Sequence, residues 1–96
     1  MRTLRITSGL AAGQSIEIDR ELVIGREDAD FTIEDSELSR RHAILRPVER
    51  GVEIEDLGSL NGTVVNGQEI SSPLTLTAPG TLKVGLSQAT VEVSLP

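Results

Sequence analysis

The stretch Val64-Val65-Asn66-Gly67-Gln68-Glu69-Ile70 gives the strongest local structural signal in the sequence. Asn-Gly between two extended runs favours a tight type I′ turn, because both residues tolerate the positive φ that its central positions require. The stretch therefore predicts a β-hairpin, and it directs attention to period-two alternation in the rest of the chain.

Alternation of apolar and polar residues predicts further strands on both sides of this hairpin. It is clearest at residues 3–7, 15–19, 52–55 and 90–94. A glycine-punctuated hairpin loop at 8–13 joins the first two of these segments. Shorter extended runs occupy residues 22–24, 31–33, 74–76 and 81–84. The last two are expected to pair through the turn Ala78-Pro79-Gly80. Many short strands with close turns predict an all-β antiparallel sandwich or barrel.

One segment does not follow this pattern. Residues 36–46, SELSRRHAILR, are rich in helix formers, and Leu38, Ala43 and Leu45 recur loosely at helical spacing. Propensity alone predicts a helix that Pro47 ends. The conflict between this helix and a β-sandwich stays open on these grounds.

The composition limits what the chain can bind. Its 96 residues suit one domain, and its net charge is −6. A protein that binds nucleic acid without sequence preference is expected to be basic, and Phe31 is the sole aromatic residue that could stack on a base. Cysteine is absent and His42 is the single histidine, which excludes disulfides, thiolate metal sites and multi-histidine metal sites. We therefore expect no nucleic acid, no metal and no cofactor.

Two further features of the sequence bear on location and on charge. The sequence has no apolar run long enough to span a membrane, and its N-terminus is unlike a signal peptide, so we expect a cytoplasmic protein without a membrane partner. Six acidic residues lie between Glu27 and Glu37, and we interpret them as a solvated loop. A calcium loop at Asp28-Ala29-Asp30 is disfavoured, because the glycine and glutamate of an EF-hand are missing at the required spacing.

Four short pieces carry a coherent chemistry: Gly25-Arg26, Ser39-Arg40-Arg41-His42, Gly58-Ser59-Leu60-Asn61-Gly62-Thr63 and Asn66-Gly67. They are expected at strand ends or in loops, where binding residues tend to lie. Arginine supplies permanently charged forked donors, serine and asparagine supply short polar groups, and glycine lets the backbone approach a ligand. This set of groups suits one phosphate and the peptide attached to it.

Together, in this order and spacing, the four pieces resemble the forkhead-associated (FHA) domain family. The resemblance implies a single FHA domain over residues 1–96, with the fold of an eleven-stranded antiparallel β-sandwich. It implies that residues 36–41 form a loop and 42–47 a strand, which reverses the helix expected from propensity. It also implies a non-catalytic module whose end loops bind a threonine-phosphorylated protein or peptide, such as a Ser/Thr kinase or its substrate.

The resemblance also assigns roles to individual residues. The residues expected to contact the phosphopeptide are Arg26, Ser39, Arg40, Ser59, Leu60 and Asn61. The residues expected to structure the loops are Gly25, His42, Gly58, Gly62 and Asn66. Leu60 departs from family members that carry a hydroxyl at this position, so one possible phosphate contact is lost. Arg41 is expected to face solvent, and Asp56 is expected to make a turn or cap at a strand end.

Other functions compete with this hypothesis. A phosphate-independent scaffold or a self-association domain could use the same fold. A DNA-binding helix built on residues 36–46 is opposed by the net charge of −6 and by the β-pattern. A hydrolase that uses Ser39 and His42 is the weakest alternative, since Gly58-Ser59-Leu60-Asn61-Gly62 lacks the glycine spacing of a nucleophile elbow.

Overall fold

The computed structural model describes residues 1–93, and in that range the chain is built from strands without a helix. In chain order the strands are β1 (Arg2–Ser8), β2 (Ser15–Glu17), β3 (Leu22–Gly25), β4 (Phe31–Thr32), β5 (Ala43–Val48), β6 (Gly51–Asp56), β7 (Thr63–Val65), β8 (Gln68–Glu69), β9 (Leu74–Leu76), β10 (Gly80–Val84) and β11 (Ser87–Val93).

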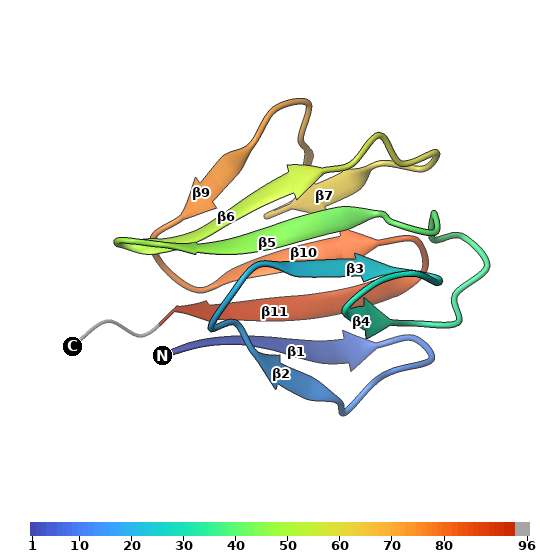
Figure 1. The fold of residues 1–96 in the computed structure, drawn as a ribbon, viewed down its shortest axis with the longest axis horizontal. Coiled ribbons are helices and arrows are strands. Elements are labelled where there is room, and N and C mark those ends of the chain that lie inside the picture. Colours follow the sequence, from blue (N-terminus) through green and yellow to red (C-terminus); the bar gives the residue numbers. More distant parts are fainter. Residues whose placement is uncertain (94–96) are drawn as a thin grey trace.

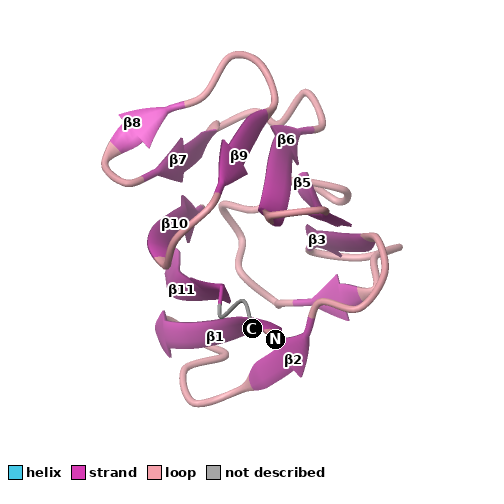
Figure 2. Cartoon of the chain, turned by 90° about the vertical axis from the view of Figure 1, so that its left-hand side faces the viewer, coloured by secondary structure: helices cyan, strands magenta, loops and turns pink. Residues whose placement is uncertain are grey.

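The strands form two sheets that pack face to face. The 6-stranded sheet has the order β2-β1-β11-β10-β7-β8, and the 5-stranded sheet has the order β4-β3-β5-β6-β9. Figure 2 shows the two sheets on opposite sides of the interior. The predicted eleven-stranded sandwich is therefore confirmed.

One strand pair departs from the expected antiparallel arrangement. β3 and β4 pair in parallel, with Ile24 opposite Phe31 and Gly25 opposite Thr32. Asp30 holds the short β3–β4 connection against β3. Its backbone N–H donates to Val23 O at 2.9 Å, and its carboxylate accepts the Val23 N–H at 2.9 Å. The smaller sheet is therefore mixed rather than purely antiparallel.

The strands predicted from alternation are present. The alternating segments correspond to β1, β2, β6 and β11, although Ser94, the last residue of the predicted 90–94 strand, lies outside the described residues. The 64–70 hairpin also forms, with φ of 50° at Asn66 and 81° at Gly67, as a type I′ turn requires.

The predicted hairpin between residues 74–76 and 81–84 is wrong. β9 pairs with β6, whereas β10 pairs with β11 and β7, so the two strands lie in opposite sheets. The chain crosses between the sheets over residues 77–79, since β9 ends at Leu76 and β10 begins at Gly80. Gly80 lies close to the Leu76 side chain, because a Cβ on Gly80 would be 3.0 Å from the Leu76 methyl carbons. The turn residues at 78–80 mark this crossing rather than a hairpin.

The helix that propensity favours at 36–46 is also wrong. Residues 36–41 form a loop and β5 begins at Ala43, which agrees with the expectation from the FHA resemblance. β5 lies between β3 and β6, and its first residues Ala43, Ile44 and Leu45 are all buried. Ala43 and Leu45 belong to the core between the sheets, whereas Ile44 lies on the other face of the strand and is 9% exposed. Such a continuous apolar run cannot be distinguished from a buried helix by periodicity alone.

The core lies between the inner faces of the two sheets. Its fully buried side chains include Leu4, Leu82 and Val91 from the larger sheet and Leu45 and Ile54 from the smaller one. This core fixes the strand ends, and therefore the positions from which the loops start.

We predict that Leu45→Ala lowers the free energy of unfolding by about 2–5 kcal/mol, because it leaves a cavity between the sheets. Leu10→Ala removes the same atoms from a side chain that is 76% exposed, and it should change stability by less than about 0.5 kcal/mol. Urea denaturation of the two variants checks this, and similar losses would contradict the assigned core.

Candidate functional site

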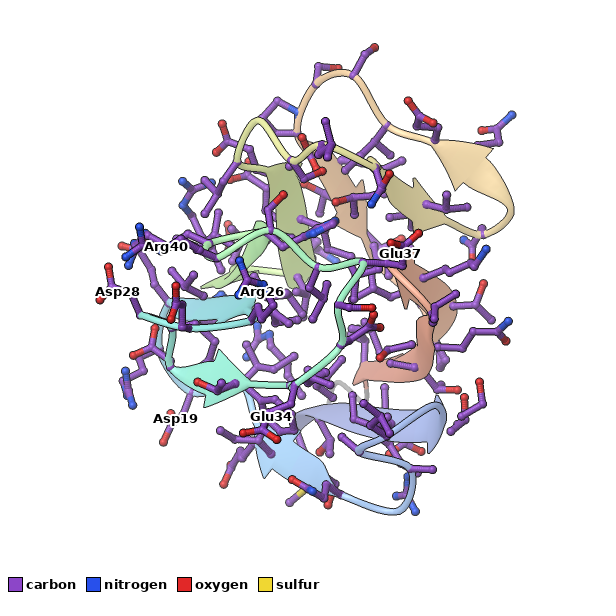
Figure 3. All side chains as sticks on the ribbon, turned by 90° about the vertical axis from the view of Figure 1, so that its right-hand side faces the viewer. Asp19, Arg26, Asp28, Glu34, Glu37 and Arg40 are labelled. Atoms are coloured by element: carbon purple, nitrogen blue, oxygen red, sulfur yellow. The ribbon has the colours of Figure 1, made fainter. Side chains whose placement is uncertain are left out.

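Three loops meet at one end of the sandwich, on the right in Figure 1. They join β3 to β4 (residues 26–30), β4 to β5 (33–42) and β6 to β7 (57–62). Figure 3 looks onto this end, with Arg26 and Arg40 labelled beside the loop that carries Glu34 and Glu37. The loops surround an open hollow of about 450 Å³, lined by Arg26, Ser36, Glu37, Leu38, Ser39, Arg40, Arg41, Leu60 and Asn61.

Arg26 lines this hollow and lies directly after β3. Its backbone N–H donates to Ser39 O at 3.0 Å, and its side-chain Nε–H donates to Leu38 O at 3.2 Å. Within residues 1–93 the two terminal nitrogens of its guanidinium have no hydrogen-bond partner. Arg26 thus connects two loops through Nε while four N–H donors stay available to a ligand.

Ser39 and Asn61 connect the same loop to the β6–β7 loop. Ser39 Oγ accepts the Leu60 N–H at 3.0 Å, which leaves its own O–H proton to donate elsewhere. Asn61 Nδ2 donates to Glu37 O at 2.9 Å, which leaves its amide oxygen as an acceptor. Both side chains therefore have one group fixed by the protein and one group free at the hollow.

His42 is fully buried and hydrogen-bonds to two of the three loops. Its Nδ1 accepts the Ser39 N–H at 3.1 Å, so in the neutral ring Nε2 carries the proton and donates to Gly62 O at 2.7 Å. Its backbone N–H donates to Ile24 O, and its carbonyl accepts the Leu57 N–H. One residue therefore fixes Ser39 relative to β3 and to the β6–β7 loop.

Gly25 is required by a close approach of two backbones. A Cβ at this position would lie 1.8 Å from Arg40 O, so any larger residue would push the β4–β5 loop away from β3. Gly58 and Gly62 belong to the β6–β7 loop, where they adopt φ of 76° and 87°.

The carboxylate of Asp56 organises the β6–β7 loop. Its Oδ2 accepts the N–H groups of Gly58 and Ser59, both at 3.0 Å, and its Oδ1 accepts the hydroxyls of Ser59 and Thr63. Partial burial on its own raises the pKa of Asp56, but these hydrogen bonds outweigh burial and hold the pKa below its usual value. The sequence indicated a turn or cap here, but not the bond to buried Thr63.

Ser59, which is predicted among the ligand contacts, has hydrogen-bond partners within its own loop. It does not line the hollow, and its hydroxyl donates to Asp56 and accepts the Gly62 N–H at 3.0 Å. These hydrogen bonds lie within the β6–β7 loop, and the contact of Ser59 with a ligand stays a prediction.

The remaining predicted residues are placed as follows. Arg40 lines the hollow and forms an exposed ion pair with Glu27, with Nε and Oε1 2.8 Å apart. Leu60 lines the hollow and is 89% exposed. Arg41 is exposed and donates to Asp28 O. Asn66 lies away from the three loops in the β7–β8 turn, where its Oδ1 accepts the Thr81 N–H at 2.9 Å.

The acidic segment 27–37 is not uniformly solvated as predicted. Asp30 is exposed but binds the backbone of Val23, and Asp35 is only 2% exposed. Asp35 accepts hydrogen bonds from Glu37, Leu86 and Ser87. Neither role is visible in the sequence, because an acidic run looks the same whether its carboxylates contact water or backbone N–H groups.

Two features are absent from residues 1–93. No group of three or more His, Cys, Asp or Glu side chains is placed to hold a metal ion there. In the same range there is no helix capable of spanning a bilayer.

The comparisons with known proteins establish the class of this protein. The FHA domain family model matches residues 22–85, so the chain belongs to the FHA domain family, and the resemblance drawn from the motifs is confirmed.

Particular relatives share this fold and sequence. FHA domain-containing protein FhaB of Mycolicibacterium smegmatis is 34% identical over 88 residues, which cover 88% of this chain and 56% of that protein. Glycogen accumulation regulator GarA of Mycobacterium tuberculosis is 37% identical over 71 residues, which cover 72% of this chain and 44% of that protein. The chain thus spans about half the length of these curated relatives.

A solved structure shares the complete fold. It is described as "Structural and functional analysis of phosphothreonine-dependent FHA domain interactions", and it matches with a TM-score of 0.87 at 29% identity. The match covers 99% of this chain and 98% of that one.

We predict that His42→Ala lowers the free energy of unfolding by about 2–5 kcal/mol, since it leaves a cavity and unpairs Ser39 N–H and Gly62 O. Arg41→Ala, in the exposed neighbour, should cost less than about 0.5 kcal/mol. Thermal and urea unfolding of both variants test this. An unchanged stability of His42→Ala would show that the imidazole does not hold the loops.

We predict that the stabilisation by Asp56 disappears in acid. Because its pKa is lower in the folded chain than its usual value of 3.8, the contribution is complete above pH 3.8 and declines as the pH falls below it. Asp56→Asn should therefore be less stable than the unaltered protein at pH 7, and the difference should narrow below pH 3.8. Urea denaturation from pH 7 to 3 measures it, and a constant difference would contradict the assignment.

Proposed function

We propose that residues 1–96 are one FHA domain that binds threonine-phosphorylated proteins without catalysis, in signalling by Ser/Thr kinases. The observation that supports this most strongly is the convergence of free polar groups on one hollow. Arg26 presents its terminal N–H groups, Ser39 its hydroxyl and Asn61 its amide oxygen. Membership of the FHA family and the likeness to a phosphothreonine-dependent FHA structure support the same function.

The chemistry of each group suggests its role. A phosphate dianion accepts several hydrogen bonds at once, and those from arginine are charge-assisted and frequently bidentate. We assign the phosphate contacts to Arg26, Ser39 and Arg40, and we assign the peptide backbone to Asn61. Arg40 has to share its guanidinium between the phosphate and Glu27.

Apolar surface beside these donors supports threonine over serine. Leu38 and Leu60 line the hollow together with Ser39. We propose that the threonine γ-methyl packs in this region, where burying one methyl is worth about 0.8 kcal/mol.

The bonding of Ser39 and His42 supports binding rather than hydrolysis. His42 Nδ1 accepts the backbone N–H of Ser39, not its hydroxyl, and Nε2 is bonded to Gly62 O. Neither ring nitrogen is placed to take the serine proton, as a nucleophile requires. The cytoplasm is the compartment we propose, because the name of the relative GarA refers to glycogen accumulation, an intracellular process.

We predict that Arg26→Ala and Ser39→Ala abolish measurable binding of a phosphothreonine peptide selected from an oriented peptide library. Each removes a donor to a charged group, worth about 1.5–3 kcal/mol. Arg5→Ala is the control for Arg26→Ala, because it makes the same change of net charge at an exposed ion pair with Glu92 on the larger sheet. The Arg5→Ala variant should bind the peptide as tightly as the unaltered protein does. Calorimetry on folded variants measures this, and retained binding in Arg26→Ala would refute the assignment.

We predict that binding requires the doubly charged phosphate. Its second pKa is about 6, so affinity should fall between pH 7.5 and pH 5. The phosphoserine version of the peptide should bind more weakly, and the unphosphorylated version should not bind. Flat affinity across this pH range, or equal affinity for all three peptides, would contradict the proposed function.

A phosphate-independent scaffold is the second candidate, and exposed leucines favour it. Leu10 and Leu86 are 76% and 66% exposed, and they lie on the β1–β2 and β10–β11 turns. Both turns are at the same end of the sandwich as the hollow (Figure 1). Binding of a partner that survives Arg26→Ala but is lost in a Leu10→Ser, Leu86→Ser double variant would support this function instead.

A further inference from the structure

Asp35 connects the β4–β5 loop to a turn that is distant in sequence. Its Oδ1 accepts the Glu37 N–H at 2.9 Å within the loop. Its Oδ2 accepts the Leu86 N–H at 2.8 Å and the Ser87 hydroxyl at 2.9 Å, in the turn between β10 and β11. One buried carboxylate thus bonds to two segments about fifty residues apart.

The partners of Asp35 make this connection specific for a carboxylate. All three groups donate protons, so both oxygens must act as acceptors. An asparagine has the same size but replaces one oxygen with an amino group, which would face an N–H donor. A buried donor left without an acceptor is costly, so the loop or the turn has to move. The space is also tight, since a Cβ on Gly85 would lie 2.9 Å from Asp35 Oδ2.

The segment that follows Asp35 carries the proposed binding groups. Asp35 O accepts the Leu38 N–H at 3.0 Å, which closes a turn over residues 35–38. Leu38 O then accepts from Arg26 Nε, and Glu37 O accepts from Asn61 Nδ2. Asp35 does not line the hollow itself. A shift of the turn at Asp35 would therefore move the carbonyls that orient Arg26 and Asn61.

We propose that Asp35 is a positioning residue through which the β10–β11 turn sets the affinity for the phosphothreonine ligand. This inference rests on the proposed function, because it concerns the affinity of the same hollow. It goes further in placing control of the site at a turn that contributes no side chain to it.

The first experiment changes the carboxylate. We compare Asp35→Asn with Glu34→Gln, a control that removes the same charge from the exposed neighbouring residue. Each variant is titrated with the library-selected phosphothreonine peptide. Titrations are made well below the melting temperature of each variant. Asp35→Asn should raise Kd at least about fivefold, the lower end of typical coupling between two sites. Glu34→Gln should leave Kd within about twofold.

The second experiment changes the turn and leaves Asp35 intact. Gly85 and Leu86 are the first and second central residues of the turn. Gly85 has a φ of 58° and Leu86 does not have a positive φ, as expected for a type II′ turn. The φ of proline suits this second position, so Leu86→Pro removes the N–H that Asp35 accepts while the turn is kept. Leu86→Ala keeps the N–H and removes the exposed side chain. Leu86→Pro should raise Kd as Asp35→Asn does, and Leu86→Ala should not.

These outcomes separate a positioning role from a merely structural one. If Asp35→Asn and Leu86→Pro lower the melting temperature but bind the peptide with unchanged Kd, the inference is overturned. If Leu86→Ala weakens binding as much as Leu86→Pro, the side chain rather than the N–H is responsible, and the inference is again overturned. If the unaltered protein does not bind phosphothreonine peptides, the proposed function itself fails. Should Asp35→Asn not fold, the Leu86 pair decides.

Discussion

The hydrogen bonds of the buried His42 imidazole are the constraint on which the loop end of the sandwich depends. Three loops of irregular backbone meet there, and irregular backbone has no ladder of its own to satisfy its polar groups. His42 accepts from Ser39 on one side and donates to Gly62 on the other, while its backbone joins Ile24 and Leu57. The imidazole thus joins the β4–β5 loop to the β6–β7 loop, and because His42 lies directly before β5, its backbone can bond to β3 at the same time.

Two carboxylates extend this arrangement outward. Asp56 fixes the β6–β7 loop through four donors, and Asp35 fixes the β4–β5 loop against the β10–β11 turn. Within the described residues no buried side-chain nitrogen or oxygen lacks a partner. A fully satisfied polar network of this kind is rigid, because each group that moved would leave another unpaired in a medium of low dielectric constant. The hollow is therefore pre-formed, which reduces the ordering cost of binding a ligand.

This architecture reconciles a chain of net charge −6 with a site for a phosphate. Asp35 and Asp56 direct their oxygens at backbone and hydroxyl donors, away from the hollow, while Arg26 and Arg40 present guanidinium groups to it. Local geometry at close range outweighs the overall charge, since interactions between exposed charges are screened beyond about 8–10 Å. The sign of the net charge is thus a poor guide to the ligand of a small site.

The sequence by itself determined the β-class, most strands, the Asn66-Gly67 turn and the set of motifs at the loop end. These depend on local properties such as period-two alternation, the φ tolerance of Asn and Gly, and motif spacing. Tertiary structure decided that β9 and β10 lie in opposite sheets, that residues 43–45 form a central strand, and that Ser59 bonds within its loop. It also decided that Asp35 is buried, because its partners Leu86 and Ser87 lie some fifty positions away. A hydrogen bond across that separation exists only after the two sheets have packed, so no local pattern in the acidic segment could have indicated it.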